Sequence, residues 1–223
     1  MKAWLRAGMV CLLSGMAWAD PCTDKMVAVA RHEWEFFGKQ TIREGKISQP
    51  GHREAEEGYW QRVGVFWKVG VNLPLTGKDT DEPWSAAFIS YVMRQAGAGE
   101  RFLYSEWHAH YIQRAMKARE EQDANYGFWG YRLSERPPQV GDLVCYARQD
   151  GVDFDHLPTV FKSHSDLVVA VRPREIDVIG GNVEDSVTLK VLATDERGYL
   201  IDKHNRWIAV LENRFMLTKN DDD

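Results

Sequence analysis

Three residues that together can form a hydrolytic site lie where regular elements are predicted to begin or end. Ser85 stands at the start of an apolar helical stretch, His164 directly precedes an apolar run, and Asn182 follows the next apolar run. A hydroxyl in the first turn of a helix lies near free backbone N–H groups, whose partial positive charge favours its ionised form. Such a nucleophile also needs a base and a group that orients the base. The sequence therefore predicts Ser85 as nucleophile, His164 as base and Asn182 as orienting residue.

Asp166 is a second candidate for orienting the histidine. Because side chains alternate between the two faces of a strand, Asp166 and His164 are expected on the same face. Each of these residues also has a structural interpretation. Serine is favoured near helix starts, a histidine at a strand end is often only hydrogen-bonded, and Asn182 in a Gly-Gly-Asn turn is suited to a positive φ.

The segments around these residues resemble those of the CHAP-type and NlpC-type cell-wall amidases. Residues 84–88 read Trp-Ser-Ala-Ala-Phe, where those enzymes carry Trp-Cys-Ala-Ala-Phe. Similar matches are Gly-Asp-Leu at 141–143, His-Ser-Asp-Leu-Val at 164–168 and Gly-Asn at 181–182. The resemblance implies a papain-like fold and an amidase or peptidase that acts on peptidoglycan peptides, with the order of nucleophile, base and orienting residue preserved.

A closer resemblance is to a family of bacterial exported proteins known only as a domain of unknown function. Its members carry Pro-Trp-Ser-Ala-Ala-Phe-Ile-Ser, as found here at 83–90, and the similarity extends over residues 34–215. The shared pattern includes Trp84, His108 and Tyr111. The resemblance implies that these three residues lie beside Ser85 and contact the substrate.

Serine at position 85 replaces the cysteine of the amidases. A serine hydroxyl is far less acidic than a thiol, so a Ser85–His164 pair would be neutral and would require general-base help. Two classes of function remain open. One is a peptidoglycan amidase or peptidase, or a serine hydrolase of another ester or amide; the other is a non-catalytic module that binds cell-wall peptide or a partner protein.

The beginning of the chain reads as an export signal. Lys2 and Arg6 precede an apolar stretch from Ala7 to Met16, and Ala-Trp-Ala at 17–19 is a small-x-small cleavage site. The apolar stretch is shorter than the roughly 20 residues that span a bilayer, so cleavage is expected and a stable membrane anchor is not. This predicts a signal peptide at 1–19, one domain at 20–223, and a periplasmic or secreted protein.

Charge and motif content exclude other classes of partner. The formal net charge is −5, and removal of Lys2 and Arg6 with the signal would make it more negative, so nucleic acid is not an expected partner. No metalloprotease spacing such as His-Glu-x-x-His occurs, although His108 and His110 could pair with nearby acids. No metal or cofactor is therefore predicted, and the oligomeric state is left open.

Cys22 and Cys145 remain after removal of the signal, in a compartment that permits disulfides. Two interpretations stay open. The two cysteines form a bridge that ties the N-terminus to the middle of the fold, or Cys145, within an apolar run, is a small buried hydrophobe.

Periodicity predicts the elements that must position the site. Apolar residues at three- and four-residue steps indicate four helices, at about 24–37, 60–71, 81 to 97 or 99, and 106–121. Ser85 lies near the start of the third, and Ser105 is expected to cap the fourth. Strands are predicted at 143–147, 167–171, 176–179, 186–191 and 207–211. The polar residues of 186–191 are expected on a solvated face, and 38–58 and 127–138 are predicted loops. Helices followed by strands favour an α+β domain, with N-terminal helices packed on a mostly antiparallel C-terminal sheet.

Overall fold

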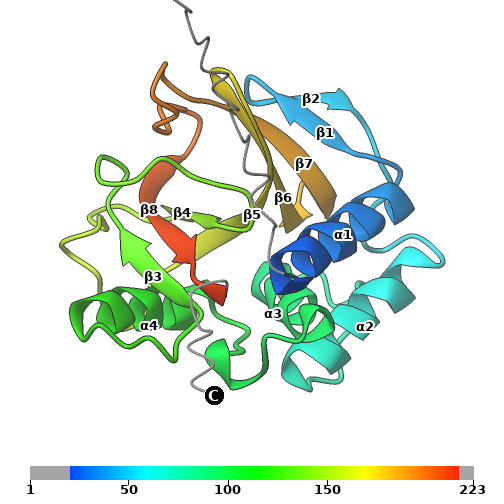
Figure 1. Ribbon diagram of the computed structural model, residues 1–223. Coiled ribbons are helices and arrows are strands. Elements are labelled where there is room, and N and C mark those ends of the chain that lie inside the picture. Colours follow the sequence, from blue (N-terminus) through cyan, green and yellow to red (C-terminus); the bar gives the residue numbers. More distant parts are fainter. Residues whose placement is uncertain (1–20, 216–223) are drawn as a thin grey trace, which may run out of the picture.

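The computed structural model describes residues 21–215, and these form four α-helices and one eight-stranded sheet (Figure 1). The helices are α1 (Pro21–Phe36), α2 (Tyr59–Val71), α3 (Ser85–Ala96) and α4 (His108–Glu120), and a short 3-10 helix covers Gly99–Arg101. The predicted α+β class is confirmed. The signal peptide predicted at residues 1–19 lies outside the described residues.

The strands are β1 (Thr41–Arg43), β2 (Lys46–Gln49), β3 (Phe128–Tyr131), β4 (Leu143–Ala147), β5 (Ser163–Arg172), β6 (Glu175–Val183), β7 (Ser186–Ala193) and β8 (Arg206–Asn213). Their order across the sheet is β2-β1-β7-β6-β5-β4-β8-β3. Neighbouring strands are antiparallel except β1 and β7, which are parallel. The prediction of a mostly antiparallel sheet is confirmed.

Helix α3 is the central helix of the fold. It contacts α1 and α2 as well as strands β5 and β6, whereas α4 packs beside β3 (Figure 1). Every residue from Ser85 to Met93 is buried, because other elements surround this part of the helix. At Gly70 of α2 an added Cβ would lie 2.4 Å from the carbonyl oxygen of Ala87, so a bare backbone lets α2 approach α3 closely. This packing fixes the position of Ser85.

The third helix begins later than its sequence pattern predicts. Ser85 is its first residue and Trp84 is the N-cap, so Pro83 precedes the helix; the predicted end is confirmed at Gly97, whose φ is +81°. The first helical bond runs from the N–H of Phe88 to the carbonyl of Trp84, and no side chain caps the first turn. The N–H groups of residues 85–87 therefore lack helical acceptors, and they leave the positive end of the helix dipole at Ser85.

Two predicted loops contain strands. β1 and β2 lie within the predicted loop 38–58, and β3 lies within 127–138. These strands are only three or four residues long, which is too short for a periodicity. Strands β1 and β3 are held by partners far along the chain, and β2 pairs with β1. Gln40, beside β1, donates a hydrogen bond to the Thr188 hydroxyl of β7 at 2.8 Å, and β3 pairs with β8.

The expectation of a solvated face on strand β7 is wrong. Ser186 and Thr188 are fully buried and Lys190 is 4 % exposed. Polar partners make this burial possible: Thr188 pairs with Gln40, and the Lys190 ammonium lies 2.7 Å from Oδ2 of Asp166. The polar residues of β7 thus line the interior of the protein.

Cys145 on β4 carries a fully buried thiol and forms no disulfide with Cys22. Of the two interpretations of this cysteine, the buried hydrophobe is the one that the structure shows.

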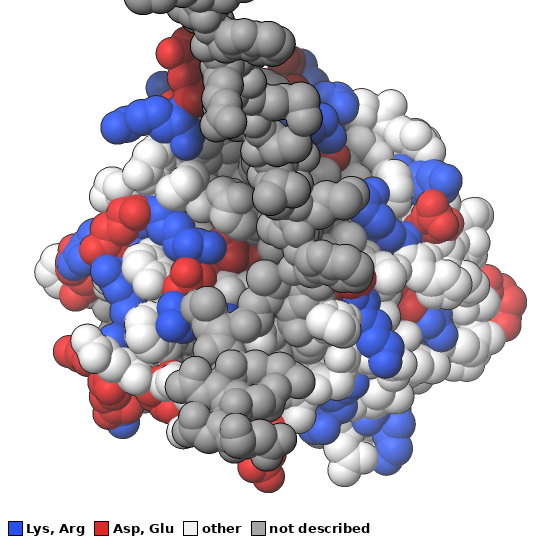
Figure 2. Space-filling model, in the orientation of Figure 1, with Lys and Arg blue, Asp and Glu red and all other residues white. Residues whose placement is uncertain are grey.

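Basic and acidic side chains are interspersed over the face drawn in Figure 2. Charged side chains of opposite sign also pair, as Arg119 does with Glu135 and Arg136 with Glu212. Within residues 21–215 no helix combines the length and the apolar character that crossing a membrane requires.

Candidate active site

Ser85 is hydrogen-bonded to a histidine of helix α4. Its Oγ lies 2.6 Å from Nε2 of His108, the first residue of that helix. Both side chains are 4 % exposed, and both line a cavity of about 500 Å³. His108 was expected to bind substrate and His164 to serve as the base. In the described structure the histidine within hydrogen-bonding distance of Ser85 is His108.

A pair of buried serines connects the middle of α3 with the segment just before α4. The Ser90 hydroxyl donates to the carbonyl of Ser105 at 3.0 Å and accepts from the N–H of Ser105 at 3.2 Å. Ser90 is fully buried on α3, and Glu106 and Trp107 separate Ser105 from the first residue of α4. Ser105 was predicted to cap the fourth helix, but the N-cap is Trp107, whose N–H donates to the Ser105 hydroxyl at 2.9 Å. This connection places His108 opposite Ser85.

Tyr111 lies behind His108, one turn further along α4. Its hydroxyl is hydrogen-bonded to Nδ1 of His108, and the tyrosine is fully buried. The side chain of Tyr111 is covered and engaged with the histidine, and its expected contact with substrate stays a prediction. Burial lowers the pKa of His108 well below its usual value of 6.5, and the charge of His164 lowers it further. His108 is consequently neutral at pH 7, with one lone pair free to accept a proton.

His164 is paired with Asp166 on the same face of β5, as the strand alternation predicted. Its Nε2 lies 3.1 Å from Oδ1 of Asp166, and the other carboxylate oxygen faces Lys190. Burial alone would raise the pKa of Asp166, but the charges of Lys190 and His164 outweigh it and lower the pKa to about 2. Asp166 is thus an ionised, fully buried carboxylate at neutral pH.

Gly180 on the neighbouring strand leaves room for this pair. An added Cβ there would lie 2.1 Å from Oδ1 of Asp166 and 2.8 Å from Nε2 of His164. At Gly181 an added Cβ would lie 2.6 Å from both the Cβ of Phe88 and Cζ3 of Trp84. The two glycines therefore admit close contacts on opposite faces of β6, one with the His164–Asp166 pair and one with α3.

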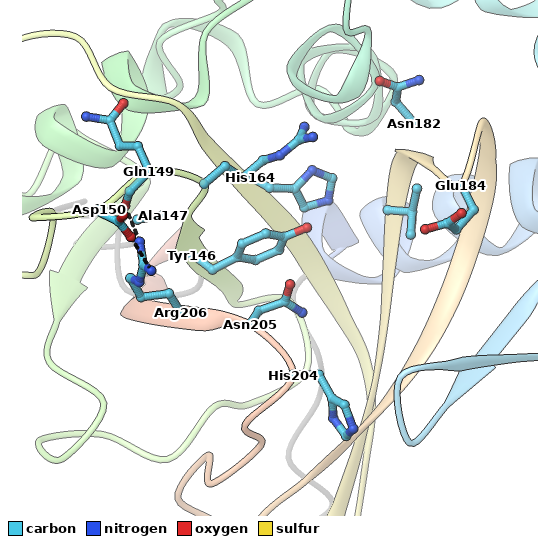
Figure 3. A pocket seen from close by; sticks show the side chains of 12 residues that line it. Tyr146, Ala147, Gln149, Asp150, His164, Asn182, Glu184, His204, Asn205 and Arg206 are labelled. Carbon is cyan, nitrogen blue, oxygen red and sulfur yellow. Dashed lines mark hydrogen bonds and ion pairs between the residues drawn. The ribbon is translucent and has the colours of Figure 1, made fainter.

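A second cavity, of about 580 Å³, adjoins the first. Tyr146 and His164 lie side by side at its wall, with ring centroids 5.0 Å apart, and Asn182 and Glu184 lie across from them (Figure 3). Asn182 and Arg148 line both cavities. On the other side, the His164 ring lies 5.1 Å from the ring of His108. His164 therefore connects the Ser85 site with the second cavity.

Asn182 does not orient a histidine. Its amide donates to Oε2 of Glu54 at 2.7 Å, and its φ of +56° shows that the turn uses the tolerance of asparagine for this conformation. The indole N–H of Trp84 donates to the same oxygen at 2.5 Å. Trp84 is 1 % exposed and packs in the core, and its expected contact with substrate stays a prediction.

Glu54, Arg148 and Lys190 belong to the site but were not found from the sequence. Glu54 is 5 % exposed, and burial raises its pKa. It was missed because it lies in a polar segment that was predicted to be a loop. Arg148 is exposed, and its charge lowers the pKa of both His108 and His164. Lys190 lies in a strand where apolar and polar residues alternate, and such a pattern leads one to expect the lysine on the solvent-facing side. Neither Arg148 nor Lys190 is part of a motif.

Acidic side chains outnumber basic ones around the Ser85 cavity. Glu54, Asp81, Glu106 and Asp185 line it together with Arg148 and Lys162. Among residues 21–215 no three His, Cys, Asp or Glu side chains converge in a way that would hold a metal ion. The groups that the structure brings together are those of proton transfer: a hydroxyl, a neutral imidazole, and a second imidazole held by a buried carboxylate.

The family described as "Uncharacterized protein conserved in bacteria (DUF2272)" matches residues 72–217. The matched segment contains Ser85, His108, His164 and Asp166. No curated protein and no solved structure matches the chain.

Proposed function

The chain belongs to the DUF2272 family of bacterial proteins, and we propose that it is a serine hydrolase of amide or peptide bonds with Ser85 as nucleophile and His108 as base. One observation carries the proposal: the 2.6 Å separation of Ser85 Oγ and His108 Nε2 at the wall of a cavity. A serine is a weak nucleophile unless a base lies within hydrogen-bonding distance of its hydroxyl. Nε2 of His108 lies within that distance of Ser85 Oγ.

In the proposed reaction, neutral His108 takes the proton of Ser85 as the serine oxygen attacks the substrate carbonyl. The oxyanion that forms is stabilised by the free N–H groups at the start of α3. His108 is then a cation, and the negative charge of Asp166 favours it, since this charge raises the pKa of His108. His108 returns the proton to the leaving amine, and a water molecule repeats both steps to release the acyl group.

The resemblance to cell-wall amidases supports peptidoglycan stem peptides as the substrate, in the periplasm or outside the cell. The arrangement of the elements supports a papain-like relationship as well. A nucleophile begins a central helix, and a histidine with its carboxylate lies at the start of a strand that packs on this helix. In this proposal His164 keeps the position of the amidase histidine, while His108 has taken over the contact with the nucleophile.

The test is to incubate the purified protein with sacculi and to identify released fragments by mass spectrometry. We expect fragments that disappear with Ser85→Ala and persist with Ser48→Ala, a matched control at an exposed serine of β2. Equal release by Ser85→Ala would exclude this residue as the nucleophile.

A second candidate is a non-catalytic module that binds cell-wall peptide. The low exposure of Ser85 and the low basicity of His108 favour it, because both reduce the reactivity of the pair. In that case the protein co-sediments with sacculi equally well with Ser85 or Ala at position 85, and the native protein releases no fragment.

A further inference from the structure

One cation where the two cavities meet has no partner in the protein. Arg148 directly follows β4, and its side chain lines both the Ser85 cavity and the second cavity. Within residues 21–215 its guanidinium forms no hydrogen bond and no ion pair. A guanidinium carries several N–H donors in a planar fork, so an unused anion-binding group lies between the two cavities.

The other basic side chains that line the second cavity each have a carboxylate partner. They are Arg206 with Asp150 at 2.6 Å (Figure 3), His204 with Asp202 at 2.9 Å, and His164 with Asp166 at 3.1 Å. Because these carboxylates already occupy the donors, an incoming anion gains less there than at Arg148. The unpaired state of Arg148 is therefore a specific feature of this position.

The backbone of Arg148 is held in place while its side chain is free. Its N–H donates to the carbonyl of Lys162 at 2.8 Å, and the N–H of Lys162 donates to Oε1 of Gln149 at 2.8 Å. The Lys162 side chain lines the Ser85 cavity and also has no ion pair in the part of the chain that the structure describes. Two cations without partners therefore line the cavity that contains Ser85.

The acidic side chains of the same cavity restrict which anion can bind. Glu54, Asp81, Glu106 and Asp185 also line it. Their charges repel a dianionic phosphate more strongly than a carboxylate, which carries a single negative charge. A guanidinium also binds a carboxylate through two parallel hydrogen bonds, which selects for this group by its shape. A carboxylate is therefore the anion that fits the boundary between the cavities.

We propose that Arg148 binds a free carboxylate of the substrate, which makes the substrate an acidic peptide. The carboxylate lies where the two cavities meet, and the amide bond to be cleaved lies at Ser85. Arg148 is thus a specificity-determining residue, which contacts the substrate away from the reacting atoms. The choice of a peptide rests on the proposed function, but the preference for a carboxylate requires no turnover.

Binding of matched peptides tests the preference. The probes are a synthetic stem peptide with free carboxylates and versions in which one carboxylate at a time is a carboxamide. Calorimetric titration at pH 8 keeps His108 and His164 neutral, because burial lowers the pKa of both rings. Ser85→Ala is titrated beside the native protein, so that cleavage cannot disturb the measurement.

We expect one of the amidations to weaken binding by about 10-fold or more, as loss of a charge-assisted hydrogen-bonded pair does. Equal affinity for all the peptides, or no binding of any of them, would overturn the inference.

Variants test whether Arg148 makes this contact. Arg148→Gln should weaken binding of the free-carboxylate peptide by the same factor and leave binding of the amidated peptide unchanged. Arg148→Lys keeps the charge but loses the planar fork, so it should restore part of the affinity. Arg197→Gln is the matched control, since that side chain is 80 % exposed and lines neither cavity. Equal weakening of both peptides by Arg148→Gln would contradict a direct contact with the carboxylate.

Fragment release separates this inference from the proposed function. In an active protein, Arg148→Gln should raise KM for the free-carboxylate peptide about 10-fold and change kcat little at pH 8. If the native protein is active and Arg148→Gln still distinguishes the two peptides, the inference fails and the proposed function stands. If the native protein cleaves nothing but Arg148→Gln abolishes a preference for the carboxylate, the proposed function fails and the inference stands.

Discussion

The rings of His108 and His164 lie with their centroids 5.1 Å apart, and each is held by a different partner. His108 is bonded to Ser85, whereas His164 is bonded to Asp166. Ser85 and the buried carboxylate of Asp166 therefore lie at the two ends of a row that contains two imidazoles. The first of these contacts the serine, and the second brings a negative charge close to the first.

The two histidines should differ in their effect on activity. His108→Ala removes the hydrogen-bond partner of Ser85, and we expect a loss of about 10²- to 10⁴-fold in kcat/KM for fragment release, the usual contribution of a general base. His164→Ala should cost less, because His164 acts through His108. His156→Ala is the control, since that side chain is 77 % exposed. A larger loss for His164→Ala than for His108→Ala would return the role of base to His164.

The pH dependence of the rate should reflect the low pKa of His108. Because only the neutral form accepts a proton, the rate should stay constant from pH 8 to below 6.5 and fall only as His108 becomes protonated. The charged groups that act on this ring are His164, Asp166, Arg148 and Lys190. Removal of a positive charge by Arg148→Gln should raise the pKa, so the acidic limb of the pH–rate profile moves to higher pH.

Arg206→Gln is the matched control for this charge effect. Arg206 lines the second cavity but is paired with Asp150 at 2.6 Å. Its loss should leave the acidic limb in place. If Arg148→Gln and Arg206→Gln give the same profile as the native protein, the charge of Arg148 does not reach His108.

Gly180→Ala should disrupt the His164–Asp166 pair. The new methyl group would lie 2.1 Å from the carboxylate, and we expect overpacking to cost about 1–3 kcal/mol in the free energy of unfolding. Gly64→Ala in α2 is the contrasting change, because its nearest neighbour would be 3.5 Å away and alanine favours a helix by about 0.5–1 kcal/mol. Urea unfolding of both variants checks this. Equal stability of Gly180→Ala and the native protein would mean that the pair has room to move.

Acid should weaken the fold partly through Asp166. Its pKa is about 2 in the folded protein and about 3.9 in an unfolded chain. Because the unfolded state takes up the proton first, this carboxylate contributes stability above about pH 4 that is lost as the pH falls toward 2. The contribution is roughly 2–3 kcal/mol. Asp166→Asn should therefore show a smaller loss of unfolding free energy between pH 4 and pH 2 than the native protein.

The same variant should be less stable at neutral pH, because it leaves the Lys190 ammonium buried without its counter-charge, at a cost of about 3–5 kcal/mol. Asp150→Asn provides the comparison, since that side chain is 95 % exposed and its pair with Arg206 should contribute little. If Asp166→Asn matched Asp150→Asn at pH 7, the buried ion pair would have no role in stability.

The elements with a clear period were predictable. The apolar repeat of 60–71 corresponds to α2, and the short apolar run at 143–147 corresponds to β4. Strands β1 and β3 could not be predicted, because each consists of a few residues held by a partner far along the chain. The face of β7 was assigned wrongly, because alternation cannot distinguish water from a buried carboxylate that neutralises Lys190.

The location of the candidate site was predictable from the sequence, but the histidine that contacts Ser85 was not. The position of Ser85 at a helix start, and of His164 and Asp166 on one strand face, follows from local pattern. The contact of Ser85 with His108 joins two different helices, and the hydrogen bonds of Ser90 with Ser105 hold the segment that precedes α4 against α3. No local sequence pattern predicts hydrogen bonds between two separate segments such as those that contain Ser90 and Ser105.

The hydrogen bonds between Ser90 and Ser105 also bear on how the protein folds. They join residues that are 15 positions apart in the sequence, and Ser85 and His108 are 23 positions apart. By contrast, Gln40 and Thr188 are 148 positions apart. Since the entropy lost on closing a loop grows with its length, contacts between α3 and α4 are the less costly to form. The serine and its histidine can therefore meet early, and the buried carboxylate joins them only when the long-range strands have paired.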